Sequence, residues 1–170
     1  MKLKEEQTLV LIKPDGVQRG LIGEVISRLE KVGLKLVGIK LVVPNAEMIG
    51  RHYAKMKDPI LGHLKKLMTS GPVVAMAWEG AHAIGVVRKI IGSTEPLSSD
   101  VGTIRGDYTV DSYQLADADG RAVRNIVHAS GNAEEAKEEI KLWFKSEDLV
   151  RYRLISEAIL YDVNLDGILE

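Results

Sequence analysis

Histidine, arginine and glutamate side chains are the residues of this sequence with the clearest chemical potential. His128 follows the apolar residues Ile126 and Val127 and stands four residues before Asn132, where a helix is expected to begin. At a strand-to-helix junction, free backbone N–H groups and the positive end of the helix dipole favour an anion. A neutral imidazole at such a place can act as a nucleophile. His128 is therefore a candidate catalytic residue, and a structural histidine is the alternative.

The other three histidines carry weaker signals. His52 precedes a tyrosine on an expected helix and His63 lies among lysines, so we expect both at the surface. His82 is expected to be a polar residue at the start of a helix.

Two arginines stand where a phosphate could be bound. Arg105 lies between Gly102 and Gly106, where the backbone can approach a ligand closely, and Arg88 precedes the same loop. One guanidinium group can donate to two phosphate oxygens at once, so two arginines near one histidine would form a phosphate site. Solvated surface charges are the alternative. Glu139 borders the apolar side of a helix, where it could orient a histidine or merely mark the edge of that side.

Length and composition limit the class of protein. The 170 residues predict a single domain over residues 1–170, and 23 basic against 24 acidic residues give a net charge of −1. This balance argues against a generic binder of nucleic acid or anionic membranes. The absence of cysteine excludes disulfides and thiolate sites. No span of bilayer length and no apolar leader is present, so we expect a cytoplasmic protein. The sequence also lacks dinucleotide-binding, P-loop, HExxH and GxSxG motifs.

The elements that would position these residues alternate between strands and helices. Apolar runs predict strands over residues 8–13, 34–43, 73–78 and 122–127. Helical spacing predicts helices over residues 22–32, 45–53, 60–68 and 81–91, and a last one opening at Asn132 with Ala133, Ala136, Ile140 and Trp143 buried. Residues 92–120 are expected to be an irregular loop, and residues 150–170 to pack around the outside. This order favours a ferredoxin-like βαββαβ fold with a four-stranded antiparallel sheet; a doubly wound fold is the alternative.

Several motifs resemble one family. The segment NIVHASG around His128 is similar to the active-site motif of nucleoside diphosphate kinases. IKPDGVQRGLIGEVISRLE, SGPVVAMAWEG, GSTEP and GTIRGD match further blocks of that family in order, so that the resemblance runs from Thr8 to Tyr161. It implies a ferredoxin-like core, a homo-oligomer that is usually a hexamer and sometimes a tetramer, and transfer of a γ-phosphate, typically from ATP, to a nucleoside diphosphate.

The resemblance also implies a role for individual residues. His128 would attack the γ-phosphate and hold it as phosphohistidine, and Glu139 and Ser130 would orient it. The matching nucleotide-site positions are Lys13 and Asn125 at the sugar hydroxyls, Arg88, Thr94 and Arg105 at the phosphates, and Tyr53 beside the histidine. The family uses magnesium bridged between the phosphates, largely without protein ligands, which suits a sequence lacking a carboxylate cluster.

The chain departs from the family in three places. Ile60 stands near the position of the phenylalanine that stacks on the base, so we expect an apolar contact, broad base specificity and weak binding. Ala129 replaces a glycine of many members. DSYQLADADGRAV lengthens the connection between Asp107 and Asn125. We expect this polar insertion at the surface, and it leaves the catalytic assignment unchanged.

Two other functions are compatible with the predicted fold. A sensor could bind triphosphates without chemistry, but it would not need an oriented nucleophile. An RNA-recognition module would need stacking aromatics and a basic surface, whereas the chain has one phenylalanine and a net charge of −1. The enzyme is therefore the leading hypothesis.

Overall fold

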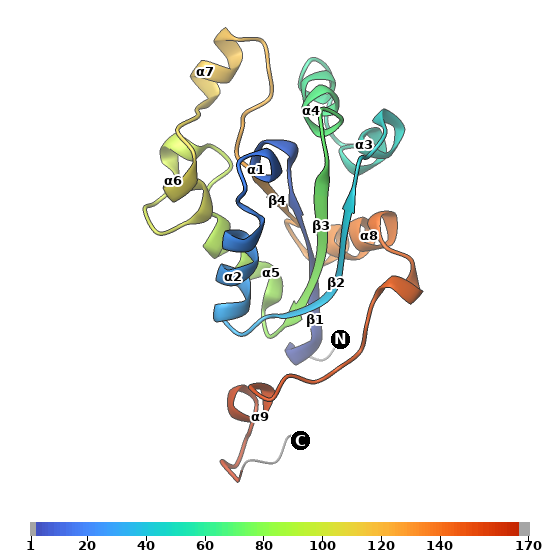
Figure 1. Cartoon of the computed structure of the whole chain (residues 1–170), viewed down its shortest axis with the longest axis vertical. Helices are drawn as coiled ribbons and strands as arrows, with labels where there is room; N and C mark the ends of the chain where they lie inside the picture. Colours follow the sequence, from blue (N-terminus) through green and yellow to red (C-terminus); the bar gives the residue numbers. More distant parts are fainter. Residues whose placement is uncertain (1–2, 167–170) are drawn as a thin grey trace.

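A four-stranded antiparallel sheet forms the centre of the computed structural model, which describes residues 3–166. Its strands are β1 (Glu6–Ile12), β2 (Lys35–Val42), β3 (Val73–Gly80) and β4 (Val127–Ala129), in the order β2-β3-β1-β4 (Figure 1). β1 pairs antiparallel with β3 and with β4, so that Leu11 lies between Ala75 and His128. This α+β architecture confirms the ferredoxin-like prediction and excludes the doubly wound alternative, which requires parallel strands.

Helices and short helical turns connect the strands. The α-helices are α1 (Pro14–Gln18), α2 (Ile22–Lys31), α3 (Ala46–His52), α4 (Ile60–Met68), α5 (Ala83–Ile91), α6 (Ile104–Tyr108), α7 (Tyr113–Ala118), α8 (Ala133–Trp143) and α9 (Glu157–Leu160). Single 3₁₀ turns lie at Leu3–Glu5, Pro96–Ser98 and Ser146–Asp148. Most predicted helices are confirmed to within two or three residues.

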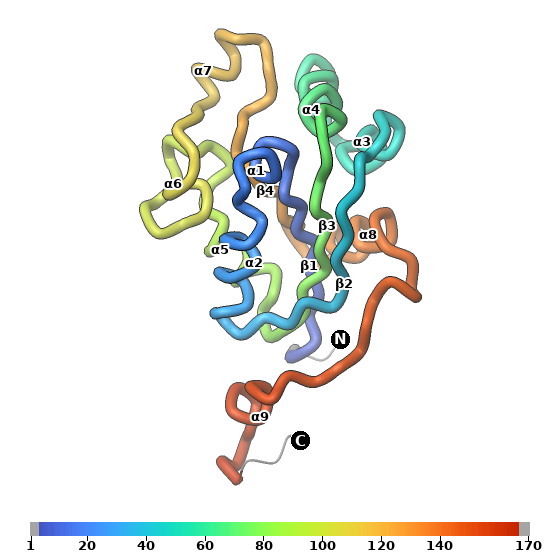
Figure 2. The backbone as a smooth tube through the Cα atoms, in the orientation of Figure 1, coloured from blue at the N-terminus to red at the C-terminus, as the bar shows by residue number. Residues whose placement is uncertain are grey.

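Both faces of the sheet are buried, because neighbouring residues of a strand point to opposite faces. Val10 and Ile12 of β1 pack with α2 and α5, whereas Leu9 and Leu11 pack with α3, α4 and α8. The path of the chain shows these two groups of helices on opposite sides of the sheet (Figure 2). β1 is therefore buried on both faces, and it holds in place Lys13, the residue that follows its end.

Three predicted elements differ from the structure. The fourth strand is Val127–Ala129 instead of residues 122–127, because Ile126 adopts a positive φ of 57° and breaks the extended backbone. The stretch 92–120 holds a 3₁₀ turn and two short helices, α6 and α7, whose N-caps Thr103 and Ser112 accept backbone N–H groups. Each of these helices is too short to show a helical period in the sequence. Pro14, expected in a turn, begins α1.

The last long helix and the tail follow the predicted course. Asn132 caps α8 by accepting the N–H of Glu135, and Ala136, Ile140 and Trp143 are buried, but Ala133 is exposed at the first helical position. Beyond α8 the chain runs along β2, where the Val150 N–H donates to the Val37 carbonyl oxygen, and α9 lies past the end of the sheet (Figure 1). Within residues 3–166, no helix combines the length and the apolar character needed to cross a bilayer.

Candidate active site

A cavity of about 810 Å³ opens beside β4, between α3 and α4 on one side and the segment 113–123 on the other. This volume lies within the usual range for a small-molecule site. The cavity is lined by nine of the ten residues selected from the sequence: Lys13, Tyr53, Ile60, Arg88, Thr94, Arg105, Asn125, His128 and Glu139. Ser130 does not line it and lies behind Glu139, fully buried.

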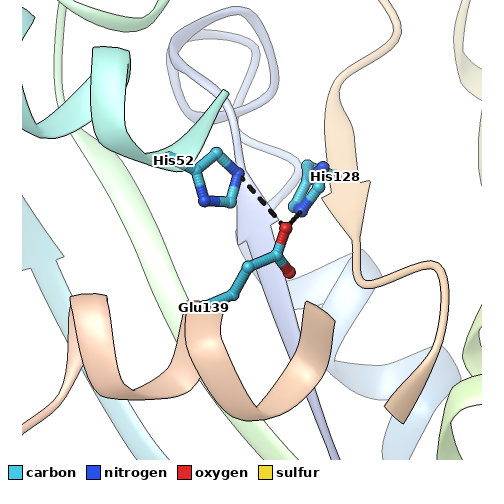
Figure 3. A group of neighbouring side chains, drawn as sticks. All are labelled: His52, His128 and Glu139. Carbon is cyan, nitrogen blue, oxygen red and sulfur yellow. Dashed lines mark hydrogen bonds and ion pairs between the residues drawn. The ribbon is translucent and has the colours of Figure 1, made fainter. Parts of the chain in front are cut away.

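His128, Glu139 and Ser130 form a hydrogen-bonded chain at the base of the cavity. Nε2 of His128 lies 3.0 Å from Glu139 Oε1 (Figure 3). The Ser130 hydroxyl donates to Glu139 Oε2 over 2.6 Å. The Leu9 N–H on β1 donates to the Ser130 hydroxyl oxygen, which connects these three residues to the sheet. Burial tends to raise the pKa of Glu139, but the hydrogen bonds from His128 and Ser130 outweigh it, and the pKa falls below its ordinary value.

The tautomer of His128 follows from the charge on Glu139. A carboxylate can only accept hydrogen bonds, so a neutral His128 ring carries its hydrogen on Nε2. Its Nδ1 then has a free lone pair. The side chain is 19% exposed and lines the cavity, so a ligand can reach that lone pair. The arrangement is that of an oriented nucleophile.

Lys13 and Asn125 lie beside this nucleophile as a buried pair. The Lys13 ammonium donates to Asn125 Oδ1 over 2.7 Å, and Asn125 Nδ2 donates to the Thr94 carbonyl oxygen over 2.7 Å. Burial lowers the pKa of Lys13 to about 8, opposed by Asp15 and assisted by Arg105. An anionic ligand close to Lys13 would favour its charged form and raise its pKa again.

Arg105 is held by the backbone around the cavity. Its guanidinium donates to three carbonyl oxygens, those of Asn125 at 3.3 Å, Gly92 at 3.0 Å and Val127 at 2.7 Å. Burial, followed by the positive charge of Arg88, lowers its pKa to about 10. Because a guanidinium has five N–H groups, two remain for a ligand. Arg88 is exposed on the same cavity from α5.

Tyr53, at the end of α3, has a hydroxyl group without a hydrogen-bond partner in the described part of the chain. Its ring centroid lies 5.8 Å from that of His128, and the hydroxyl is buried. Burial raises its pKa. Such an orphaned hydroxyl, in a cavity that Arg105 also lines, can donate to an anionic oxygen of a ligand.

The insertion lies at the surface, but it also forms one wall of the cavity. Tyr113, Asp117 and Arg121 line the cavity opposite Ile60, which is 58% exposed on α4. Asp111 fixes this wall: its carboxylate accepts from Arg121 at 2.6 and 3.0 Å and from the Arg124 N–H at 2.7 Å. The insertion is thus at the surface as expected, and the sequence did not indicate that it also lines the cavity.

Two histidine predictions were wrong. The side chain of His52 is fully buried against His128 and Glu139, and His63 is half-buried in the wall of the cavity. His52 follows buried Ile49 by three residues, and this helical spacing could have indicated an inward position. His82, by contrast, is the exposed N-cap of α5, as predicted.

Comparison with known proteins shows to which family the chain belongs. The sequence profile of nucleoside diphosphate kinase matches residues 6–149. The chain belongs to the nucleoside diphosphate kinase family. A nucleoside diphosphate kinase 3 of Spinacia oleracea is 49% identical over 94% of this chain and 98% of its own length. A chloroplastic/mitochondrial nucleoside diphosphate kinase III of Arabidopsis thaliana is also 49% identical, and the chain spans 63% of that relative.

Solved structures of nucleoside diphosphate kinases share this fold. The enzyme of Borrelia burgdorferi, a transition-state mimic with bound vanadate and ADP, has a TM-score of 0.89 and 36% identity over 93% of this chain and 98% of that chain. An enzyme of Pyrobaculum aerophilum has a TM-score of 0.82 and 40% identity over 86% of this chain and 100% of that chain. A shared fold at this identity supports nucleoside diphosphate kinase activity for the chain.

Proposed function

We propose that this chain transfers the γ-phosphate of a nucleoside triphosphate, typically ATP, to a nucleoside diphosphate through a phosphate held on His128. The hydrogen bond between His128 Nε2 and Glu139 carries the proposal, since it leaves the lone pair of Nδ1 facing the cavity. Membership of the nucleoside diphosphate kinase family supports the reaction class.

In the first half-reaction, the Nδ1 lone pair attacks the γ-phosphorus. The bond between that phosphorus and the oxygen bridging it to the β-phosphate breaks, and the diphosphate leaves with the bonding electrons. In the second half-reaction, a terminal oxygen of another diphosphate attacks the phosphorus, and the N–P bond returns its electrons to Nδ1. Glu139 offsets the positive charge that the imidazole gains on phosphorylation.

Cationic and hydroxyl groups would hold the phosphates in line with Nδ1. Arg88 and the two remaining N–H groups of Arg105 would bind phosphate oxygens, and Thr94 would add a hydroxyl. Lys13 and Asn125 would contact the sugar hydroxyls, and the Tyr53 hydroxyl would donate to the transferred group. Positioning and charge stabilisation carry most of the rate enhancement in phosphoryl transfer.

Magnesium fits this site as an ion held by the nucleotide. Glu139, which accepts from Ser130 and pairs with His128, is already engaged, so we expect phosphate oxygens and water to supply the oxygen ligands that Mg²⁺ prefers. When bound, the ion would neutralise phosphate charge beside Arg88 and Arg105.

At the base end, Ile60 and Leu64 of α4 would contact one face of the base. Apolar contact is non-directional, so we expect purine and pyrimidine nucleotides to be accepted. The insertion wall with Tyr113 supports binding from the opposite side.

We also propose a homo-oligomer, with a hexamer favoured over a tetramer. Ile39 and Leu41 of the edge strand β2 are exposed, and exposed apolar side chains on an edge strand can form an association surface. Light scattering on the purified protein tests this size. A single domain over residues 1–170 and a cytoplasmic location stay predictions; limited proteolysis and cell fractionation would test them.

Retention of labelled phosphate tests the proposed reaction. After incubation with γ-³²P-labelled ATP, the denatured protein should carry an acid-labile, base-stable phosphate, and initial-rate plots should be parallel. His128→Ala should bind nucleotide and retain no label, whereas His82→Asn, outside the cavity, should be labelled like the original protein. Equal labelling of the His128→Ala protein would refute the assignment.

A further inference from the structure

His52 is a buried histidine that the proposed mechanism does not use. It ends α3, its side chain is 0% exposed, and its ring lies edge-on to that of His128 with centroids 4.5 Å apart. Its two nitrogens face different partners. The indole nitrogen of Trp143 on α8 lies 3.2 Å from Nδ1. Glu139 Oε1 lies 3.9 Å from Nε2 (Figure 3).

The contact with Trp143 fixes the tautomer of His52. An indole N–H can only donate, so Nδ1 of His52 must be the acceptor. Burial, assisted by the neighbouring His128, lowers the pKa of His52 to about 3, and the ring is neutral near pH 7. A neutral ring that accepts at Nδ1 carries its hydrogen on Nε2. That N–H has no hydrogen-bond partner within residues 3–166, and Glu139 is the carboxylate that it faces.

We propose that His52 is a positioning residue, whose Nε2–H group holds Glu139 in the orientation that keeps Nδ1 of His128 directed into the cavity. At 3.9 Å the contact is longer than a formed hydrogen bond. In this buried setting, however, an N–H dipole aimed at a carboxylate is only weakly screened. Catalytic hydrogen bonds are often long without substrate and shorten when the substrate binds. A small rotation of the Glu139 carboxylate would close this one.

The same three residues have the spacing of a metal site, but the tautomer argues against one. One ligand atom each of His52, His128 and Glu139 lie within 4.8 Å of one another, and two imidazoles with a carboxylate are a common zinc ligand set. A metal on Nε2 of His52 would require that nitrogen to have a free lone pair and the hydrogen to move to Nδ1. That hydrogen would then oppose the Trp143 N–H. The positioning role, by contrast, is compatible with a hydrogen on Nε2 and with the Trp143 contact at Nδ1.

The first test reads the tautomer directly and does not depend on activity. Two-bond ¹H–¹⁵N spectra of the ¹⁵N-labelled protein near pH 7 should show His52 with its hydrogen on Nε2. A His52 ring protonated on Nδ1, or on both nitrogens, would overturn the proposal whatever the protein catalyses.

The second test rests on the proposed function and measures the rate of enzyme phosphorylation from ATP in single turnover. His52→Phe keeps a ring but has no N–H, and it should slow phosphorylation by about 10–100-fold, the effect seen when a partner that orients a reactive ligand is lost. Nucleotide affinity should change little. His52→Gln, whose amide nitrogen can take the place of Nε2, should recover most of the rate. Trp143→Phe, which frees Nδ1, should slow the step in the same direction by a smaller factor.

Controls separate the two proposals. Failure of the original protein to retain phosphate would refute the proposed function, while the tautomer measurement would still stand. If the original protein is labelled and His52→Phe reacts at the same rate, His52 does not position Glu139. Equal losses in His52→Phe and His52→Gln, accompanied by equal losses of thermal stability, would also overturn the proposal, because they indicate a merely structural role. His82→Asn serves as the matched histidine outside the cavity and should leave every readout unchanged.

Discussion

The two arginines of the cavity should respond differently to replacement by alanine. Both are proposed to bind phosphate, but Arg105 is 6% exposed and donates to three carbonyl oxygens, whereas Arg88 is exposed on α5. Arg88→Ala should therefore affect turnover alone. Arg105→Ala should affect turnover and folding stability together.

The size of the stability loss follows from the contacts of Arg105. Three hydrogen bonds from a charged donor contribute about 1.5–3 kcal/mol each, or roughly 5–9 kcal/mol in total. The fall of the Arg105 pKa from 12.5 to about 10, caused by burial and then by the charge of Arg88, corresponds to a cost of roughly 3 kcal/mol that the variant no longer bears. The net loss is then about 2–6 kcal/mol. For a domain of this size it should lower the melting temperature by roughly 5–20 °C.

Thermal melts and steady-state kinetics on both variants test this reasoning. Each variant should lose roughly 10²-fold in kcat, the usual effect of removing one stabilising donor from a transition state. The melting temperature of Arg88→Ala should stay within 1–2 °C of the original, which corresponds to roughly 0.5 kcal/mol. If both variants melt alike, the three carbonyl contacts of Arg105 do not stabilise the fold. If Arg105→Ala raises KM with kcat unchanged, the residue is only a binding contact.

Three further variations test other parts of the cavity. Ile60→Phe should bind ADP, GDP and CDP several-fold more tightly in calorimetric titration, because a ring stacks on every base. Asp111→Ala should release the insertion wall, with faster proteolysis between residues 112 and 121 and a KM raised several-fold, since Arg121 and two backbone N–H groups lose their acceptor. Raising the pH above about 8 should lower kcat/KM, because Lys13, with its pKa of about 8, loses its charge there. Between about pH 8 and 10.5, the unfolded lysine binds more protons than the folded one. The free energy of unfolding should therefore rise as the pH increases through this range.

Each of these predictions has a contradicting result. Unchanged affinity in Ile60→Phe, or a strong preference for one base, would mean that another residue holds the base. Proteolysis at the original rate in Asp111→Ala would show that the wall is fixed by other contacts. A kcat/KM profile that is flat between pH 7 and 9 would show that the charge on Lys13 does not contribute to nucleotide capture.

The sequence by itself determined most of the elements and singled out the proposed nucleophile. Strands β1 and β3 are continuous apolar runs because both of their faces are buried, and the capping residues Asn45 and Asn132 mark helix starts through contacts three residues away. These signals are local, so they can be read from a single chain. The NIVHASG motif likewise identified His128, and the geometry brings it to Glu139 and Ser130 as the resemblance implied.

Only the tertiary structure decided what surrounds the nucleophile. The partners of His52 come from α8 and β4, and Trp143 is 91 residues away in the sequence, so no local pattern announces that contact. The Asp111–Arg121 ion pair joins the two ends of the insertion, and it forms only in the folded chain. The sequence made Arg105 a candidate for phosphate binding, but only the fold places three carbonyl oxygens around its guanidinium. Burial and hydrogen bonding between distant segments set the charge, tautomer and orientation of these groups, and both arise only when the chain has folded.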